Sequence, residues 1–238
     1  MKYITRFNPS TSGGLHVGHV FVARLNEQFA LDSNGQFFVR IVDDYSPGIE
    51  VYGAERCQRQ AEGYVEDLNW LGFQVDEYQY ESAMVEEARR LLRERFHYEP
   101  LPELPHVMNY RNTPVILTRP DVLTYPHTPT ITAEKVVMDW MTGTNLLVRG
   151  LDLLTEFSLY EQYCRMFGVP EPQQFYVDRL TYHGQDMSKH GGAMQLGFLR
   201  RQGYSAQDIE ESLRIGCLAN PLNGWRPYNL KREPTFNL

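Results

Sequence analysis

Hydrophobic and polar residues along this chain follow a pattern that switches repeatedly between the period of a strand and the period of a helix. Short apolar runs rich in Val, Ile and Phe predict strands at residues 3–7, 36–42, 115–118, 146–148 and 175–180. Longer segments with helical spacing predict helices at residues 17–29, 50–71, 84–95, 133–142, 153–167 and 206–213. Because strands and helices alternate, we expect a doubly wound, Rossmann-like α/β fold with a parallel sheet covered on both faces.

The regular pattern breaks between about residue 74 and residue 128, where the stretches "YEPLPELPHVMNY" and "LTRPDVLTYPHTPT" are rich in proline. Proline interrupts helices and central strands, so a periodic element is not expected there. We therefore expect a short inserted connective subdomain at 74–128, between two halves of one α/β domain at 1–73 and 129–205. A C-terminal helix and tail would occupy 206–238.

Composition is that of an ordinary globular enzyme. The chain has 238 residues, of which 42% are hydrophobic and 22% are charged, and this length is sufficient for a full core. The formal net charge of −7 argues against a generally basic nucleic-acid-binding protein, without excluding a local basic face.

The cysteines and the apolar runs indicate in which cellular compartment the protein is expected. Cys57, Cys164 and Cys217 are far apart and form no C-x-x-C pair, so we expect no zinc site, no disulfide framework and a reducing, cytoplasmic setting. No apolar run approaches the length of a membrane span, and "MKYITRF" lacks the apolar core of a signal peptide. A membrane partner is therefore not expected.

The stretch "NPSTSGGLHVGHV", residues 8–20, follows the first predicted strand and opens the first predicted helix. Backbone N–H groups at such a helix start attract phosphates. His16 and His19 lie on one helix face and could donate to phosphate oxygens, while Gly18 would leave room for a base or ribose. Taken alone, the motif is equally compatible with a capped helix start that has two half-buried imidazoles.

Three further motifs each allow a chemical and a purely structural interpretation. In "GQDMSKHGG", Ser188 and Lys189 could clamp the outer phosphates of ATP or belong to a polar surface loop. In "NLLVRGLDLLTEF", Arg149 ends a strand and could hold a carboxylate or form a structural salt bridge. In "FVRIVDDYSPG", Asp43 and Asp44 could hold an ammonium group or simply belong to a turn.

The order of these motifs resembles the catalytic domain of class I glutamyl- and glutaminyl-tRNA synthetases. "RFNPSTSGGLHVGHVFVARLN" is similar to the first signature of that family, "EDLNWLGF" to an early helix and "DMSKHGG" to the second signature, with Val-Arg-Gly-x-Asp between them. The resemblance covers nearly the whole chain and is weakest over 74–128. It implies a ligase in which the carboxylate of an amino acid attacks the α-phosphate of ATP, giving an aminoacyl adenylate and pyrophosphate, with Mg²⁺ as the metal.

The resemblance also implies roles for individual residues. The catalytic residues would be His16, His19 and Lys189. The remaining ATP-binding residues would be Gly18, Asp152, Met187 and Ser188. The amino acid would be bound by Arg6, Ser10, Asp43, Ile131 and Arg149.

Departures from the family pattern concern the amino acid above all. Glutamate-specific relatives have Arg-Ile-Glu-Asp where this chain has Arg-Ile-Val-Asp at residues 40–43, which removes the acid that would meet the α-ammonium group; Asp43 or Asp44 would replace it. The family's Pro-Thr-Tyr-Asn aligns with residues 129–132, so Ile131 replaces a tyrosine hydroxyl. Asp186 stands in place of a lysine in the second signature. The identity of the amino acid therefore stays open.

The acceptor stays open too. Family members continue into an anticodon-binding domain, whereas this chain stops soon after its second signature. We therefore expect an adenylate-forming ligase whose acceptor is a small molecule, a carrier protein or a tRNA that need not be a standard one. The alternatives are glutamylation of a modified tRNA base, a nucleotidylyltransferase of the wider H-x-G-H class, and a non-catalytic module that binds nucleotide or amino acid. Val-Arg-Gly-x-Asp followed by Met-Ser-Lys disfavours the nucleotidylyltransferase.

Overall fold

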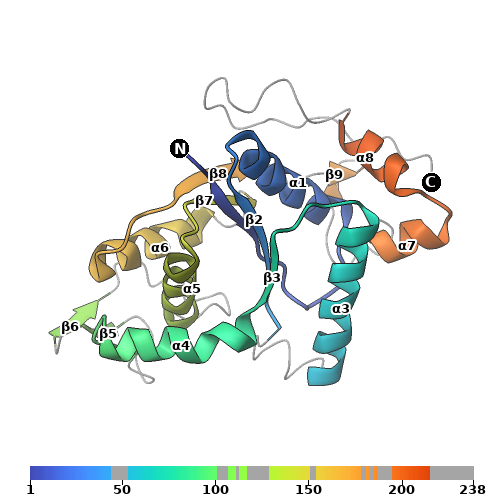
Figure 1. The fold of residues 1–238 in the computed structure, drawn as a ribbon. Coiled ribbons are helices and arrows are strands. Elements are labelled where there is room, and N and C mark those ends of the chain that lie inside the picture. The colour runs from blue at the N-terminus through green and yellow to red at the C-terminus, as the bar shows by residue number, and fades with distance from the viewer. Residues whose placement is uncertain are drawn as a thin grey trace.

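A five-stranded sheet forms the centre of the computed structural model (Figure 1). The structure describes residues 1–43, 53–100, 107–110, 113–116, 129–150, 154–177, 181–182, 185–186 and 195–214. In the order β3-β2-β1-β7-β8, the strands are Glu77–Tyr80, Gln36–Ile41, Ile4–Phe7, Leu146–Gly150 and Gln173–Val177. All neighbouring pairs are parallel, which confirms the predicted doubly wound α/β fold.

Helices cover both faces of this sheet (Figure 1). One face packs against α1 (Val17–Asp32), α3 (Ala54–Trp70), α7 (Leu196–Arg201) and α8 (Ala206–Arg214). The other face packs against α4 (Glu81–Glu94), α5 (Pro129–Thr142) and α6 (Leu154–Phe167). Side chains alternate along a strand, so Val39 and Ile41 of β2 point into the α1–α3 core, whereas Arg40 points toward α5.

Most of the predicted elements are present. The strands predicted at 3–7, 36–42 and 146–148 correspond to β1, β2 and β7, and β8 covers the described part of 175–180. The six predicted helices correspond to α1, α3, α4, α5, α6 and α8. The sequence pattern does not predict β3, a short strand that carries Glu77 and Gln79, or α7, which has six residues.

The strand predicted at 115–118, within the expected insertion, overlaps a strand that lies outside the main sheet. Strand β6 (Thr113–Ile116) instead pairs antiparallel with β5 (Val107–Tyr110), which pairs antiparallel with β4 (Tyr98–Pro100). Pro114 has no N–H to donate to a ladder, so this strand suits the edge of a small sheet, which it occupies, better than the centre of a large one. A second small antiparallel pair joins β9 (Thr181–Tyr182) to β10 (Gln185–Asp186).

The segment expected to be an insertion overlaps the main domain. Strand β3 pairs with β2 from Phe38 and Glu77 to Ile41 and Tyr80, and α4 contributes to the core that α5 and α6 share. The boundary expected at residue 74 therefore falls inside the main domain. A short edge strand with polar side chains gives too little hydrophobic pattern to be recognised.

Gly35 explains why β2 can lie directly beside β1. Its N–H donates to Ala30 O (2.8 Å) at the end of α1, and Gln36 N–H donates to Tyr3 O (2.9 Å). A Cβ atom at residue 35 would lie 1.7 Å from Tyr3 O. Only glycine fits between the helix end and the first strand.

Two further expectations concern membranes and cysteines. Within the described ranges, no helix is both long and apolar enough to span a bilayer. Cys57 and Cys164 are free and buried, and Cys217 lies outside the described residues.

Candidate functional site

The loop between β1 and α1, residues 8–16, lies at the carboxyl-end edge of the sheet, where parallel α/β proteins bind ligands. Val42 N–H donates to Pro9 O (3.0 Å), and the Thr11 hydroxyl donates to Val42 O (3.0 Å). The buried Tyr64 hydroxyl of α3 is within hydrogen-bonding distance of the carbonyls of Ser10 (2.7 Å) and Gly13. Burial raises the pKa of Tyr64 above its usual value, so this phenol remains a donor. Contacts from β2 and α3 thus fix the course of the loop.

The two histidines of the H-x-G-H motif stack on each other at the start of α1. Their ring centroids are 3.7 Å apart, the planes differ by 23°, and both side chains are half-buried. His19 Nδ1 accepts a hydrogen bond from the backbone N–H of His16 (3.3 Å). Because Nδ1 is an acceptor, the proton of a neutral His19 ring lies on Nε2, which makes Nε2–H a hydrogen-bond donor.

Gly18 leaves space for the imidazole of His16. A Cβ atom at residue 18 would lie 3.0 Å from His16 Cε1 and 3.1 Å from His16 Nδ1. A side chain at this position would therefore press against the ring and disturb the stack with His19. The sequence predicted a small residue here for the sake of a ligand, and the structure adds a reason that depends on the protein alone.

The segment that follows the Met-Ser-Lys motif pairs with the histidine loop. Gln195 forms an antiparallel bridge with His16, and Leu196 N–H donates to Leu15 O (2.9 Å). The start of α7 is therefore attached directly to the start of α1. Residues Asp44, Asp152, Met187, Ser188 and Lys189 lie outside the described residues.

Two arginines dock α7 and α8 onto the rest of the α1–α3 face. Arg200 Nη1 lies 2.9 Å from Asp67 Oδ1 of α3, and its guanidinium lies over the Trp70 ring. Arg24 of α1 donates from Nε to Glu210 Oε1 of α8 (2.7 Å). These contacts hold the C-terminal helices against the helix that carries both histidines.

The opposite face of the same sheet edge carries an arginine cluster, which consists of the buried Arg6 and Arg40 and the half-buried Arg149 around Asp139. Arg6 donates from Nε (2.6 Å) and Nη2 (2.9 Å) to the two oxygens of Asp139. Arg40 Nη1 donates to Asp139 Oδ1 (2.6 Å), and the Tyr160 hydroxyl donates to Asp139 Oδ2 (2.8 Å). Burial by itself would raise the pKa of Asp139, but the charges of Arg6 and Arg40 outweigh burial and hold it below its usual value.

Arg149 is the third member of the cluster and has no ion pair with a carboxylate among the described residues. Its guanidinium lies over the Tyr160 ring, with Cζ 4.9 Å from the centroid. Burial, and then the positive charge of Arg6, lower the pKa of Arg149. A cationic group that is desolvated beside another cation is suited to receive an anion.

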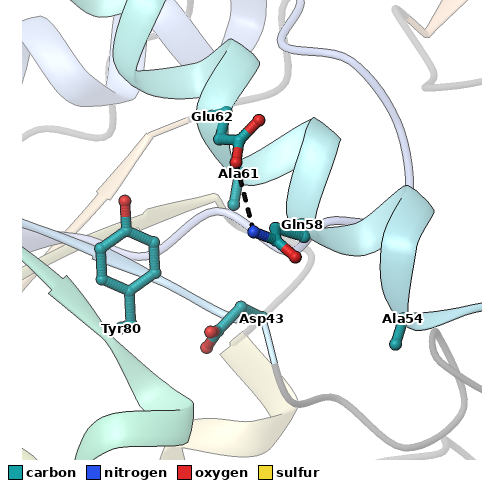
Figure 2. A pocket seen from close by; sticks show the side chains of 6 residues that line it. All are labelled: Asp43, Ala54, Gln58, Ala61, Glu62 and Tyr80. Atoms are coloured by element: carbon teal, nitrogen blue, oxygen red, sulfur yellow. Dashed lines mark hydrogen bonds between the residues drawn. The ribbon is translucent and has the colours of Figure 1, made fainter.

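Asp43 does not belong to the arginine cluster. Its Oδ1 accepts from Ser82 N–H (2.9 Å) and its Oδ2 from the Ser82 hydroxyl (2.5 Å), so it caps the first turn of α4. It also lines a pocket of about 360 Å³ together with Tyr80 and with Ala54, Gln58, Ala61 and Glu62 of α3 (Figure 2). Figure 2 shows the Asp43 carboxylate between Tyr80 and this helix. The structure does not bring Asp43 to Arg149.

The other predicted residues for the amino acid are near the edge. Ser10 bridges to Val42, and its hydroxyl lies 3.0 Å from that of Ser12. Ile131 is half-buried in the first turn of α5, the helix that carries Asp139. Arg6, expected to contact the amino acid directly, is committed to Asp139 and is only 6% exposed.

Sequence reasoning missed the partners of the cluster, Arg40, Asp139 and Tyr160. A signal was present, because a single charge interrupts the apolar strand "FFVRIV" and another interrupts the helix segment "VVMDW". Opposite charges inside two buried segments indicate an ion pair. Glu81, which is 4% exposed, and its partner Asn8 gave no such signal.

In the part of the chain that the structure describes, no three or more His, Cys, Asp or Glu side chains gather so as to hold a metal ion.

Comparison with known proteins finds similarity to one family over the N-terminal part of the chain. Residues 2–96 match the family described as tRNA synthetases class I (E and Q), catalytic domain. The chain is 37% identical over 76 residues to the glutamate–tRNA ligase of Thermococcus onnurineus and 42% identical over 77 residues to that of Mesoplasma florum. Each match covers 32% of this chain, but only 12% and 14% of those two proteins.

Solved structures extend the likeness of fold over most of the chain. A glutamate-tRNA synthetase from Elizabethkingia anophelis covers 91% of this chain with a TM-score of 0.65 at 17% identity, and this chain covers 62% of it. The methionyl-tRNA synthetase of Mycobacterium tuberculosis, solved with methionyl-adenylate bound, covers 89% with a TM-score of 0.61 at 11% identity, and this chain covers 64% of it. The fold is that of a class I synthetase catalytic domain.

Proposed function

We propose that this chain, whose residues 2–96 match the class I glutamyl/glutaminyl-tRNA synthetase catalytic family, forms an aminoacyl adenylate from an amino acid and ATP. A carboxylate oxygen of the amino acid would form a bond to the α-phosphorus, while the bond from that phosphorus to the bridging oxygen breaks and pyrophosphate leaves. Such a step depends on positioning and on neutralisation of charge rather than on a protein nucleophile.

The single observation that carries this proposal is the geometry of the histidine pair. His19 presents Nε2–H as a donor at the N-terminal end of α1, where the backbone N–H groups and the helix dipole also favour an anion. His16 and His19 would donate to phosphate oxygens as charge develops, beside Gly18. Mg²⁺ would neutralise the triphosphate when bound.

The remaining ATP contacts would come from Lys189, Ser188, Met187 and Asp152. Attachment of Gln195 to His16 supports this, because Lys189 is six residues before Gln195 and six Cα–Cα steps span at most about 20 Å. On the other side of β1, Arg149 would hold a carboxylate of the amino acid, with Arg6 fixed beside it by Asp139 and with Ser10 and Ile131 at the rim of the pocket.

We further propose that the acceptor need not be a standard tRNA. The net charge of −7 supports this, since a partner with dense phosphates is repelled overall unless basic residues gather on one face. Glutamylation of a modified tRNA base is the alternative. ATP–pyrophosphate exchange against all standard amino acids, with and without bulk tRNA and after nuclease treatment, decides between them: exchange that appears only with tRNA favours the alternative.

The ATP site is tested by His19→Ala. We expect the variant to fold normally and its exchange rate to fall about 10²- to 10³-fold, the usual cost of one transition-state donor. The exposed His97, which has a positive φ of 52°, offers a matched control as His97→Asn, which should exchange normally. Wild-type exchange in His19→Ala would refute the assignment of His19, whereas absence of exchange in the wild-type protein with every amino acid would favour the non-catalytic module.

The amino-acid site is tested by Arg149→Lys. The planar guanidinium can hold a carboxylate with two parallel bonds and lysine cannot, so we expect the KM of the amino acid to rise much more than the KM of ATP. An equal loss for both substrates would show that Arg149 is a structural residue.

A further inference from the structure

Val42 occupies the position at which the family resemblance places an acid for the α-ammonium group. Besides Asp43, which is its neighbour in the chain, a second acid, Glu81, lies close to it. Glu81 directly follows β3 and is 4% exposed. Ile41 of β2 is in register with Tyr80 of β3; Val42 directly follows the one, and Glu81, the first residue of α4, directly follows the other. The preceding pair in the register, Arg40 and Gln79, faces the arginine cluster, and side chains two residues apart along an extended backbone share a face.

Asn8 shows where the carboxylate of Glu81 lies. Asn8 follows β1, and β2 separates β1 from β3 in the sheet. Asn8 Nδ2 donates to Glu81 Oε1 (2.9 Å) and to Arg40 O of β2 (2.7 Å). One amide nitrogen thus contacts both the Glu81 carboxylate and the β2 backbone two residues before Val42.

The charges around this point suit a zwitterion. Asp139 is shared between Arg6 and Arg40, and Arg149 supplies a further positive charge. Glu81 Oε1 accepts from Asn8, while Oε2 has no hydrogen-bond donor among the described residues. An α-amino acid brings a carboxylate that complements the arginines and an ammonium group that complements Glu81.

We propose that Glu81, positioned by Asn8, binds the α-ammonium group of the amino-acid substrate in place of an acid at residue 42. This inference rests on the proposed function and assigns a residue to the same site. It replaces Asp43, whose two oxygens cap α4 through Ser82. It makes Glu81 the residue that distinguishes an α-amino acid from the same carboxylic acid without its amino group.

The test uses the amino acid that supports pyrophosphate exchange in the wild-type protein. Glu81→Gln keeps the shape and removes the charge, so we expect the KM of the amino acid to rise about 10- to 100-fold, the worth of a charged hydrogen bond, with the KM of ATP unchanged. Adding Val42→Glu to Glu81→Gln should recover most of that loss. Glu77→Gln, the same change on the exposed end of β3, is the matched control and should leave both KM values unchanged.

Three further measurements separate an effect on binding from an effect on folding. Thermal unfolding of Glu81→Gln shows whether the variant is folded, and Asn8→Ala, which keeps the charge but releases the side chain, should raise the same KM about threefold to tenfold. The substrate analogue without the amino group should inhibit wild-type and Glu81→Gln proteins equally. An unchanged KM in Glu81→Gln, or a raised KM in Asp43→Asn alone, would overturn this inference and leave the proposed function standing. Absence of exchange in the wild-type protein with every amino acid would overturn both.

Discussion

The two faces of the central sheet bury different kinds of side chain to the same extent. Ile41 on the α1–α3 face and Arg40, its neighbour on the α4–α6 face, are both 0% exposed. Ile41 packs within a continuous apolar core that includes Phe37 and Val39. Arg40 belongs to a cluster in which Asp139 receives hydrogen bonds from two guanidinium groups and a phenol.

The apolar face mainly stabilises the fold, whereas the charged face prepares a binding site. Apolar packing is not directional, so removal of one methyl group changes stability in proportion to the volume lost. A buried ionic cluster depends on every partner, because a charge left behind cannot return to water. The charged face can therefore bind a charged ligand, but substitution of a single residue in its cluster destabilises the protein more than loss of a methyl group on the apolar face does.

The largest effect is expected from removing the shared acid. Asp139→Asn leaves Arg6 and Arg40 buried without a full counter-charge, and we expect a loss of about 3–5 kcal/mol in the free energy of unfolding. Urea unfolding at pH 7 measures it. Glu87→Gln, which breaks an exposed ion pair with Arg90 on α4, is the matched control and should unfold at the wild-type urea concentration. A loss for Asp139→Asn as small as that of the control would show that the cluster contributes nothing to stability.

The same cluster predicts a particular dependence on pH. The pKa of Asp139 in the folded protein is below its ordinary value of 3.8, since Arg6 and Arg40 outweigh the effect of burial. A carboxyl group whose pKa is lower in the folded protein than in the unfolded chain stabilises the fold at pH values above its unfolded pKa. This contribution is lost as the pH falls from the unfolded pKa through the folded pKa. The difference in stability between wild type and Asp139→Asn should thus be equal at pH 7 and pH 5 and shrink below about pH 4. A difference that already shrinks between pH 7 and pH 5 would contradict this assignment.

An intermediate effect is expected on the apolar face. Ile41→Val removes one buried methyl group beside Arg40, and we expect a loss of about 0.5–1.5 kcal/mol. Urea unfolding should give the same loss at pH 7, 5 and 3, because no titrating group is changed. A loss above about 3 kcal/mol would mean that the apolar face is as intolerant as the charged one, since a single methyl group normally costs much less.

The smallest effect is expected at the half-exposed ion pair that docks α7. The Arg200 side chain is 41% exposed and pairs with Asp67, so Arg200→Gln should cost about 0.2–1 kcal/mol. The loss should diminish at 1 M salt, where exposed charges are screened. A cost that persists unchanged in high salt would point to the contact of Arg200 with the Trp70 ring rather than to the ion pair.

Local periodicity was sufficient to determine most of the elements and one part of the site. The spacing of apolar residues predicted β1, β2, β7 and the helices that pack on them, because burial of one face imposes a period on the sequence. His16 and His19 are three residues apart on one helix, so their proximity follows from helix geometry alone. The order of the motifs indicated the family, which residues 2–96 match.

Only the tertiary structure decided which distant side chains meet. Arg6 and Asp139 are joined because α5 lies on the face of the sheet to which β1 directs Arg6, and Glu81 reaches Asn8 because β3 enters the sheet in register with β2. Asp43, although adjacent in sequence to Val42, turns instead to the start of α4. Side chains alternate between the faces of a strand, so the register and order of strands, which no local pattern encodes, determine which distant side chains an acid can meet.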